Sequence, residues 1–340
     1  MESPSRIRSQ PKPACLLCGT AGRPLYGGLP DCLFDTAGEW GFSQCPRPGC
    51  GLLWLNPAPV AADLHLAYQT YYTHADAAAS QAGPSRAINL FGAIYNAAAS
   101  LPRALVALRK EQRQRACLFL ADQSPGRLLD VGCGDGAFLH QMQGRGWKVD
   151  GVDFDGKAIE NARLRHNLEL HHGDLASAGF PSSAFDAVTL NNVIEHVPDP
   201  LGLLAEAWRV VKPGGRLVVI TPNAGSLGHQ IFKEAWLGLD PPRHVHVFSP
   251  QTLRACAERV GVRSPEVWTT AAQASGFAGG SLFIAQARER GTSSPPKSGV
   301  RLGRIVKSWV LGYREHAAMK RDASLGEEVV LAGTKRGTTL

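Results

Sequence analysis

Short apolar runs alternate with amphipathic stretches through the middle of this chain. Between the runs, apolar residues recur at helical spacing, as Leu201, Leu204 and Trp208 do. The runs are predicted to be strands, at residues 128–131, 148–153, 168–172 and 185–191, and at 217–220 after a tight turn at 211–216. Strands and helices that alternate in this way predict an α/β fold, with a mostly parallel sheet and helices on both faces.

A glycine-rich turn follows the first of these runs. Residues 128–131 lead into Gly132, Gly134 and Gly136, and a helical pattern comes next. Because glycine adopts positive φ freely and lets a ligand approach the backbone, we expect a ligand-binding turn here. Asp153 ends the next strand, 19 residues after Gly134, which suits hydrogen bonding to ribose hydroxyls. The sequence therefore predicts a cofactor that contains a nucleoside.

Charge in and beside this turn discriminates between two such cofactors. Asp130 precedes the glycines and Asp135 lies among them. Two carboxylates would repel the pyrophosphate of a dinucleotide. S-adenosylmethionine has no phosphate, and its sulfonium and ammonium groups attract carboxylates and carbonyls. The pattern favours S-adenosylmethionine over NAD.

Three further segments give the chain a family resemblance. Gly173-Asp174-Leu175 follows the third strand, a polar cluster at 191–196 closes the fourth, and Lys212-Pro213-Gly214-Gly215 leads into the fifth. With the glycine turn, they resemble the class I S-adenosylmethionine-dependent methyltransferases over residues 124–270, plus a last strand at 328–335. The resemblance implies a Rossmann-like, seven-stranded, mostly parallel sheet whose seventh strand is antiparallel and inserts beside the fifth.

The resemblance also implies which residues contact the cofactor. Asp130, Gly132 and Gly134 are expected to line its methionine end. Asp153 is expected at the ribose hydroxyls, because Asp155 fits the alternative task of capping the next helix better.

The adenine end and the sulfonium are assigned to later segments. Asp174 is expected to accept a hydrogen bond from the adenine amino group, although an aspartate after Gly173 also fits an ordinary turn. Leu175 is expected to pack on the adenine ring. Asn191 ends the fourth strand, beside the position of the sulfonium in the resembled fold.

Three histidines are candidates for a catalytic base, which an oxygen or carbon acceptor requires. His196 follows the polar end of the fourth strand, and it also fits a supporting residue held by Glu195. His244 and His246 lie in the segment 240–249, where the resembled fold builds its acceptor pocket. In an extended backbone the two would face the same way. The pattern leaves open which of the three is the base.

Five of the eight cysteines fall within residues 14–56. Four of them form two knuckles, each followed by a glycine: Cys15 with Cys18, and Cys45 with Cys50. Four thiolates at such spacing predict a structural, tetrahedral Zn²⁺ site with no open position for catalysis. A redox pair is the alternative for the first knuckle. Cys32 is interpreted as a buried or free thiol, or else as a substitute ligand.

Composition divides the chain into four parts. Residues 1–13 are predicted to be a disordered tail, 14–56 a zinc ribbon, 57–123 a helical linker and cap, and 124–340 the methyltransferase domain, with a loop and basic helix inserted at about 288–325. Within the cap, Tyr71 and Tyr72 resemble an aromatic pair that closes over the cofactor.

The chain has no apolar leader and no apolar run long enough to span a membrane, so a cytoplasmic location is expected. Its net charge is +7. The basic positions of the inserted helix, Arg301, Arg304, Lys307 and Arg314, are interpreted as solvated surface, with peripheral membrane contact or a phosphorylated acceptor as alternatives. Nucleic acid is not an expected partner, because no dense stripe of basic and aromatic residues is present.

These patterns predict transfer of a methyl group to a small-molecule or sugar/glycan acceptor, nucleotide- or lipid-linked, since an N-terminal zinc ribbon resembles that of sugar- and glycan-modifying relatives. Residues 191–197 and 212–215 also resemble quinone-type O-methyltransferases, which are the alternative. An RNA-binding module on a methyltransferase fold is an alternative from another class.

Overall fold

A computed structural model describes residues 7–68, 105–291 and 302–337. The chain forms two compact units, and each is described by itself. The sheet unit comprises Gln112–Thr221, Leu253–Trp268 and Val330–Leu340. The cysteine unit comprises Met1–Glu111, Pro222–Thr252 and Thr269–Val329, so segments far apart in the sequence build it together.

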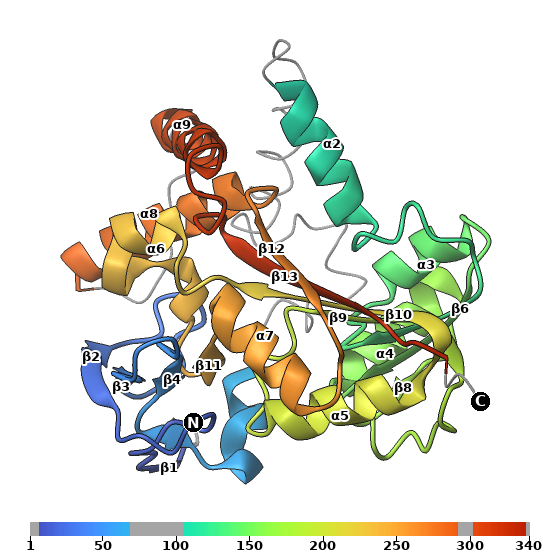
Figure 1. Ribbon diagram of the computed structural model, residues 1–340. Helices are drawn as coiled ribbons and strands as arrows, with labels where there is room; N and C mark the ends of the chain where they lie inside the picture. Colours follow the sequence, from blue (N-terminus) through green and yellow to red (C-terminus); the bar gives the residue numbers. More distant parts are fainter. Residues whose placement is uncertain (1–6, 69–104, 292–301, 338–340) are drawn as a thin grey trace. The chain divides into compact units, whose positions relative to one another are not determined.

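A seven-stranded sheet is the main feature of the sheet unit (Figure 1). Its strand order is β12-β13-β10-β9-β6-β7-β8. The strands are β6 (Arg127–Val131), β7 (Lys148–Asp153), β8 (His171–His172), β9 (Phe185–Asn191), β10 (Val211–Pro222), β12 (Glu266–Thr270) and β13 (Glu328–Thr334). Five consecutive strands of this order, β10-β9-β6-β7-β8, pair in parallel.

The seventh strand behaves as the resemblance implied. Gly214 and Gly215, near the start of β10, exchange backbone hydrogen bonds with Lys335, just after β13, whereas Asn223, just after β10, donates to Glu327, just before β13. The two strands are therefore antiparallel, and β13 lies beside the fifth strand of the sheet. The predicted fold class is confirmed, although the third strand is only two residues long instead of five.

Helices α3 (Ala137–Gln143), α4 (Gly156–His166), α5 (Pro200–Val210) and α7 (Pro250–Arg259) follow strands or turns in the chain order expected for this fold. The expected cap of α4 is confirmed, because the Asp155 carboxylate accepts from the Lys157 N–H at 3.0 Å. The apolar runs of the sequence supply the core: Leu128, Val188 and Val218 have no exposed side-chain area. α2 (Leu105–Ala116) precedes the sheet.

The cysteine unit contains a four-stranded antiparallel sheet in the order β11-β4-β3-β2 (Figure 1). Strands β2 (Arg23–Leu29), β3 (Trp40–Gln44) and β4 (Leu53–Leu55) are sequential, but β11 (His246–Val247) comes from far later in the chain. Strands β1 (Ser9–Gln10) and β5 (Ala58–Pro59) pair separately and precede the 3₁₀ helix η1 (Ala61–Tyr68). Leu29, Phe42 and Leu55 pack in one core with Trp236 and Val247, so the N-terminal strands and the later segment share a single hydrophobic interior.

The rest of the cysteine unit is helical. It contains α6 (Leu227–Phe232), the 3₁₀ helices η5 (Lys233–Ala235) and η6 (Leu237–Leu239), α8 (Ala274–Glu289) and α9 (Leu302–Met319). Helix α9 presents Ser308, Gly312 and Glu315 to the interior and leaves Val306 and Val310 about half exposed. No helix in the described ranges is both long and apolar enough to cross a membrane.

Two buried glutamates face each other in this unit. Glu315 of α9 and Glu327, just before β13, are 3% and 1% exposed. The Trp236 indole N–H and the Ser226 hydroxyl donate to Glu327. Burial raises the pKa of both carboxyl groups, and the charge of Glu327 adds to the rise at Glu315. The folded protein therefore favours their protonated forms.

This pair predicts a loss of stability at high pH. Since unfolded glutamates ionise near an ordinary pKa of about 4.3, the stabilisation is complete below that value and is lost as pH rises through the raised folded values. We expect the free energy of unfolding, measured by urea denaturation, to fall by about 1–3 kcal/mol between about pH 5 and pH 8. Glu315→Gln should flatten this dependence, whereas Glu169→Gln at an exposed position should leave it unchanged.

Candidate active site

The glycine turn joins β6 to α3 in the sheet unit. Gly132, Gly134 and Gly136 have φ values of 72°, 53° and 74°, a region that favours glycine. A Cβ atom on Gly132 would meet the Val193 side chain at 2.4 Å. A Cβ on Gly134 would meet nothing within 4 Å. The backbone at Gly134 therefore has open space beside it, where a ligand has room to approach.

Asp153, at the end of β7, ties the parts of this site together. Its Oδ2 accepts from the Gly134 N–H at 2.8 Å and its Oδ1 from the Asp155 N–H at 2.9 Å. Its carbonyl oxygen accepts from the Gly173 N–H. The side chain is 8% exposed, and burial raises the pKa of its carboxyl group. Asp153 thus fixes both the glycine turn and the loop after β8.

Asp130 lies deeper, at 4% exposure. The Thr189 hydroxyl donates to its Oδ1 at 2.6 Å. Burial, aided by the charge of Asp153, raises the pKa of Asp130 to about 7. Thr189 is a partner of this buried carboxyl group that the sequence pattern did not identify.

The loop after β8 holds the candidates for the adenine end. Asp174 is exposed, and its Oδ1 accepts from the Ser177 N–H at 2.7 Å, as a turn aspartate does. Leu175 is buried, at 2% exposure. Phe154, which directly follows Asp153, is 53% exposed. The sequence pattern did not identify this exposed aromatic ring, which directly follows the candidate ribose-binding Asp153.

Asn191 and His196 occupy the end of β9 and the loop that follows. Arg115 of α2, which is buried, donates to the Asn191 side-chain oxygen at 2.7 Å and so fixes the amide. The fully buried Glu195 accepts from the Thr221 hydroxyl at 2.9 Å. The His196 Nε2 lies 4.0 Å from the Glu195 carboxylate. The geometry is compatible with either interpretation of His196, as base or as supported neighbour.

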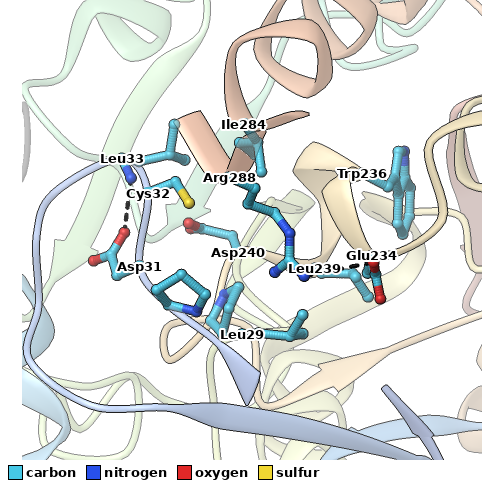
Figure 2. Close-up of a pocket in the computed structure, with 12 residues that line it drawn as sticks. Leu29, Asp31, Cys32, Leu33, Glu234, Trp236, Leu239, Asp240, Ile284 and Arg288 are labelled. Atoms are coloured by element: carbon cyan, nitrogen blue, oxygen red, sulfur yellow. Dashed lines mark hydrogen bonds and ion pairs between the residues drawn. The ribbon is translucent and has the colours of Figure 1, made fainter. Parts of the chain in front are cut away.

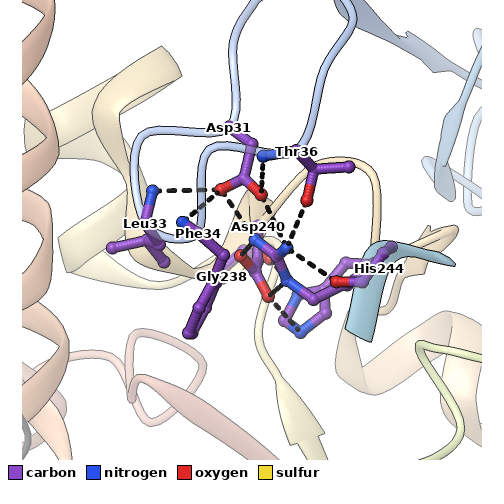
Figure 3. Close-up of polar contacts among 9 residues, drawn as sticks. Asp31, Leu33, Phe34, Thr36, Gly238, Asp240 and His244 are labelled. Carbon is purple, nitrogen blue, oxygen red and sulfur yellow. Dashed lines mark hydrogen bonds and ion pairs between the residues drawn. The ribbon is translucent and has the colours of Figure 1, made fainter. Parts of the chain in front are cut away.

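The cysteine unit carries the other two histidine candidates. His246 lies in β11 and pairs with Trp54, whereas His244 lies in the turn before that strand. His244 and His246 are 8% and 9% exposed. Arg243 lies between Asp240 and His244 in the sequence. It is wholly buried and forms ion pairs with Asp31 and Asp240, which are both labelled in Figure 3.

The His244 ring has a defined tautomer. Its Nδ1 lies 2.8 Å from the carbonyl oxygen of Gly238, and because a carbonyl only accepts, Nδ1 carries the proton. Nε2 is then the basic nitrogen, 3.9 Å from an Asp240 oxygen. Burial lowers the pKa of His244, which favours the neutral ring near neutral pH.

A small pocket of the cysteine unit is lined in part by Asp240 and Pro241, just before Arg243 in the sequence (Figure 2). It contains about 300 Å³ of empty space, open solvent included. Leu29, Leu239 and Ile284 contribute apolar walls, and Arg288 pairs with Glu234 at 3.5 Å. Cys32 also lines it, at 4% exposure, and packs with Ile284. Cys32 is thus a buried thiol away from the cysteine cluster.

The four knuckle cysteines converge. Their sulfur atoms all lie within 4.8 Å of one another, with Cys15 and Cys50 at 3.7 Å and Cys18 and Cys45 at 3.4 Å. Tetrahedral Zn²⁺ with Zn–S bonds of about 2.3 Å separates its sulfurs by about 3.8 Å. The glycines after the knuckles have positive φ, 69° at Gly19 and 70° at Gly51. The donor set and its spacing therefore fit such an ion.

The structure groups the predicted site residues by unit. Asp130, Gly132, Gly134, Asp153, Asp174, Leu175, Asn191 and His196 belong to the sheet unit. The four cysteines, His244 and His246 belong to the cysteine unit. Tyr71 and Tyr72 lie outside the described residues.

Comparison with known proteins identifies the class. The family described as a methyltransferase domain matches residues 105–264. A malonyl-[acyl-carrier protein] O-methyltransferase of Serratia marcescens is 33% identical over 214 residues, which cover 59% of this chain and 81% of that protein. A ubiquinone biosynthesis O-methyltransferase of Thiobacillus denitrificans is 32% identical over 157 residues, 42% of this chain and 66% of that protein.

Among solved structures, a SAM dependent methyltransferase from Archaeoglobus fulgidus matches 67% of this chain and 93% of its own, at 20% identity and a TM-score of 0.43. On the sequence relationships, the chain belongs to the S-adenosylmethionine-dependent methyltransferases. It is a methyl-transferring enzyme.

The geometry around Asp153 generates a prediction for the cofactor. Asp153→Asn replaces one of the two carboxylate oxygens that accept backbone N–H groups with an NH₂ group, which cannot accept. The glycine turn should therefore loosen, and one acceptor for the ribose hydroxyls should be lost. We expect calorimetric titration to show affinity for S-adenosylmethionine reduced by about tenfold or more, equivalent to about 1.4 kcal/mol. Asp150→Asn is the matched control on the same strand, where the carboxylate pairs with Arg127 at 2.8 Å. Equal affinity in both variants would contradict the assignment.

Proposed function

We propose that this enzyme transfers the methyl group of S-adenosylmethionine to an oxygen of a small-molecule acceptor, with His244 as the general base. The observation that carries the proposal is the tautomer of His244, a buried neutral imidazole whose Nδ1–H is bound to Gly238 and whose Nε2 is basic. The relatives described above are both named as O-methyltransferases, which supports oxygen as the acceptor atom.

The chemistry asked of the protein is limited. S-adenosylmethionine supplies a methyl carbon already activated by its sulfonium. His244 Nε2 would take the acceptor's hydroxyl proton as the O–CH₃ bond forms and the S–CH₃ bond breaks. The imidazolium so formed would lie near the Asp240 carboxylate, 3.9 Å from Nε2. His246 and His196 remain the alternative bases in this proposal.

For the cofactor, we propose that Asp153 binds the ribose hydroxyls and that Gly132 and Gly134 bring the backbone close to the methionine end. The open side of Gly134 supports this placement. The exposed Phe154 ring offers an apolar face for adenine, in addition to the proposed contact of Leu175. The expected hydrogen bond from the adenine amino group to Asp174 has less support, because the Asp174 Oδ1 already accepts from the Ser177 N–H.

Two acceptor classes follow from different observations. The first is a sugar or glycan acceptor, nucleotide- or lipid-linked. It is proposed because an N-terminal cysteine-rich segment such as residues 14–56 resembles the zinc ribbon of sugar- and glycan-modifying methyltransferases. A phenolic acceptor of the quinone type is the second candidate, favoured by the ubiquinone biosynthesis relative. A cytoplasmic setting is proposed as well, because none of the eight cysteines, all within the described ranges, forms a disulfide.

The base assignment predicts the effect of one substitution. His244→Gln keeps a side chain of similar length but removes the basic nitrogen, so we expect S-adenosylhomocysteine formation to fall by about 10²–10⁴-fold. The assay should use panels of nucleotide sugars and of catechol-type phenols, and cofactor affinity should stay within about twofold of the wild type. Full activity of His244→Gln on an acceptor that the wild type methylates would exclude His244 as the base.

We further propose that Cys15, Cys18, Cys45 and Cys50 hold a structural Zn²⁺. Metal analysis should find one zinc per chain, lost in Cys45→Ser and retained in Cys32→Ser. Because thiolates must be deprotonated to bind, mild acid with a chelator should release the ion and destabilise the cysteine unit. A metal content that is the same in Cys45→Ser as in the wild type would contradict the assignment.

A further inference from the structure

Arg243 is a fully buried cation held between two carboxylates. Its Nη1 and Nη2 donate to the two oxygens of Asp31 at 2.7 and 2.9 Å. Its Nε and Nη2 donate to the two oxygens of Asp240 at 2.9 and 2.6 Å. Only a guanidinium presents donors in a planar fork that serves two carboxylates at once. We name this set, Asp31, Asp240 and Arg243, the Arg243 clasp.

The N-terminal half of the clasp is itself rigidly held. The backbone N–H groups of Leu33, Phe34 and Thr36 donate to the Asp31 carboxylate at 3.0, 3.1 and 3.2 Å (Figure 3). The Arg243 guanidinium carbon lies 4.5 Å from the centre of the Phe34 ring. Asp31 therefore presents its oxygens to Arg243 in a fixed orientation, 212 positions away in sequence.

The other half of the clasp is connected to His244. Asp240 adopts a left-handed backbone, and its carbonyl oxygen accepts from the N–H groups of both Arg243 and His244, at 2.9 and 3.1 Å. The Asp240 carboxylate lies 3.9 Å from His244 Nε2. Asp240, which Arg243 holds in place, therefore determines both the backbone conformation before His244 and the negative charge near its ring.

We infer that the Arg243 clasp positions the His244 ring, so that Asp31, a residue of the N-terminal cysteine segment, acts on catalysis without contacting substrate. This inference rests on the proposed role of His244 as base. The Asp240 carboxylate, 3.9 Å from Nε2, favours the imidazolium formed when Nε2 accepts a proton, whereas the Arg243 cation opposes it. The fixed turn keeps Nδ1 of the ring on the Gly238 carbonyl oxygen.

The test compares Asp31→Asn with Asp35→Asn, an exposed neighbour in the same loop. Ring nitrogens of ¹⁵N-histidine-labelled protein are observed by NMR, with His244→Gln used to assign the His244 signals. In Asp31→Asn the amide cannot hold the guanidinium in the same way, so we expect His244 to shift from one tautomer to a mixture. Turnover should fall by about tenfold or more with cofactor affinity unchanged. Asp35→Asn should match the wild type in each measurement.

Urea denaturation and circular dichroism establish that Asp31→Asn is folded, and Arg243→Lys, which keeps the charge but loses the fork, provides a second variant. If both variants lose stability while the His244 signals stay as in the wild type, the clasp is purely structural and the inference is wrong. This NMR result is independent of catalysis. The two failures can therefore be told apart: unchanged His244 signals would overturn this inference, whereas a fully active His244→Gln variant would overturn the proposed function.

Discussion

The carboxylate of Asp153 is the constraint on which the candidate cofactor-binding edge of the sheet depends. A single side chain receives N–H groups from the glycine turn and from the start of α4, and its own carbonyl receives the N–H of Gly173. Three connecting segments are thereby set relative to one strand end. A buried carboxylate with two backbone donors is far more rigid than a loop held by water, which is what a preformed site requires.

The fold was predictable because its signal is local and repeated. Each apolar run of the sheet unit is long enough to identify a strand, and the last strand at 328–335 differs from β13 by one residue. The third strand was overestimated, since residues 168–170 are apolar at Leu168 and Leu170 without joining the ladder of β8. There, burial against the helices rather than strand pairing accounts for the apolar pattern.

The candidate sites were predictable to different degrees. The convergence of the four cysteines was predictable from their spacing, because each pair is close in the sequence and is followed by a glycine. The Arg243 clasp was not foreseen: Asp31 and Arg243 each look like an ordinary charged loop residue, and only the tertiary structure buries them together. The same holds for Arg115 and Asn191, and for Thr189 and Asp130, whose pairing depends on which strands become neighbours.

The discontinuity of the cysteine unit has a consequence for how the protein is made. At a synthesis rate of about 5–20 residues per second, the 212 positions between Asp31 and Arg243 correspond to about 10–40 s. During that interval the nascent N-terminal strands lack β11 and the apolar residues that complete their core, and the Asp31 carboxylate lacks its cation. The contacts among Cys15, Cys18, Cys45 and Cys50, like the pairing of β2 with β3 and of β3 with β4, involve only residues 15–55. These contacts can therefore form on the ribosome before the rest of the interior is synthesised.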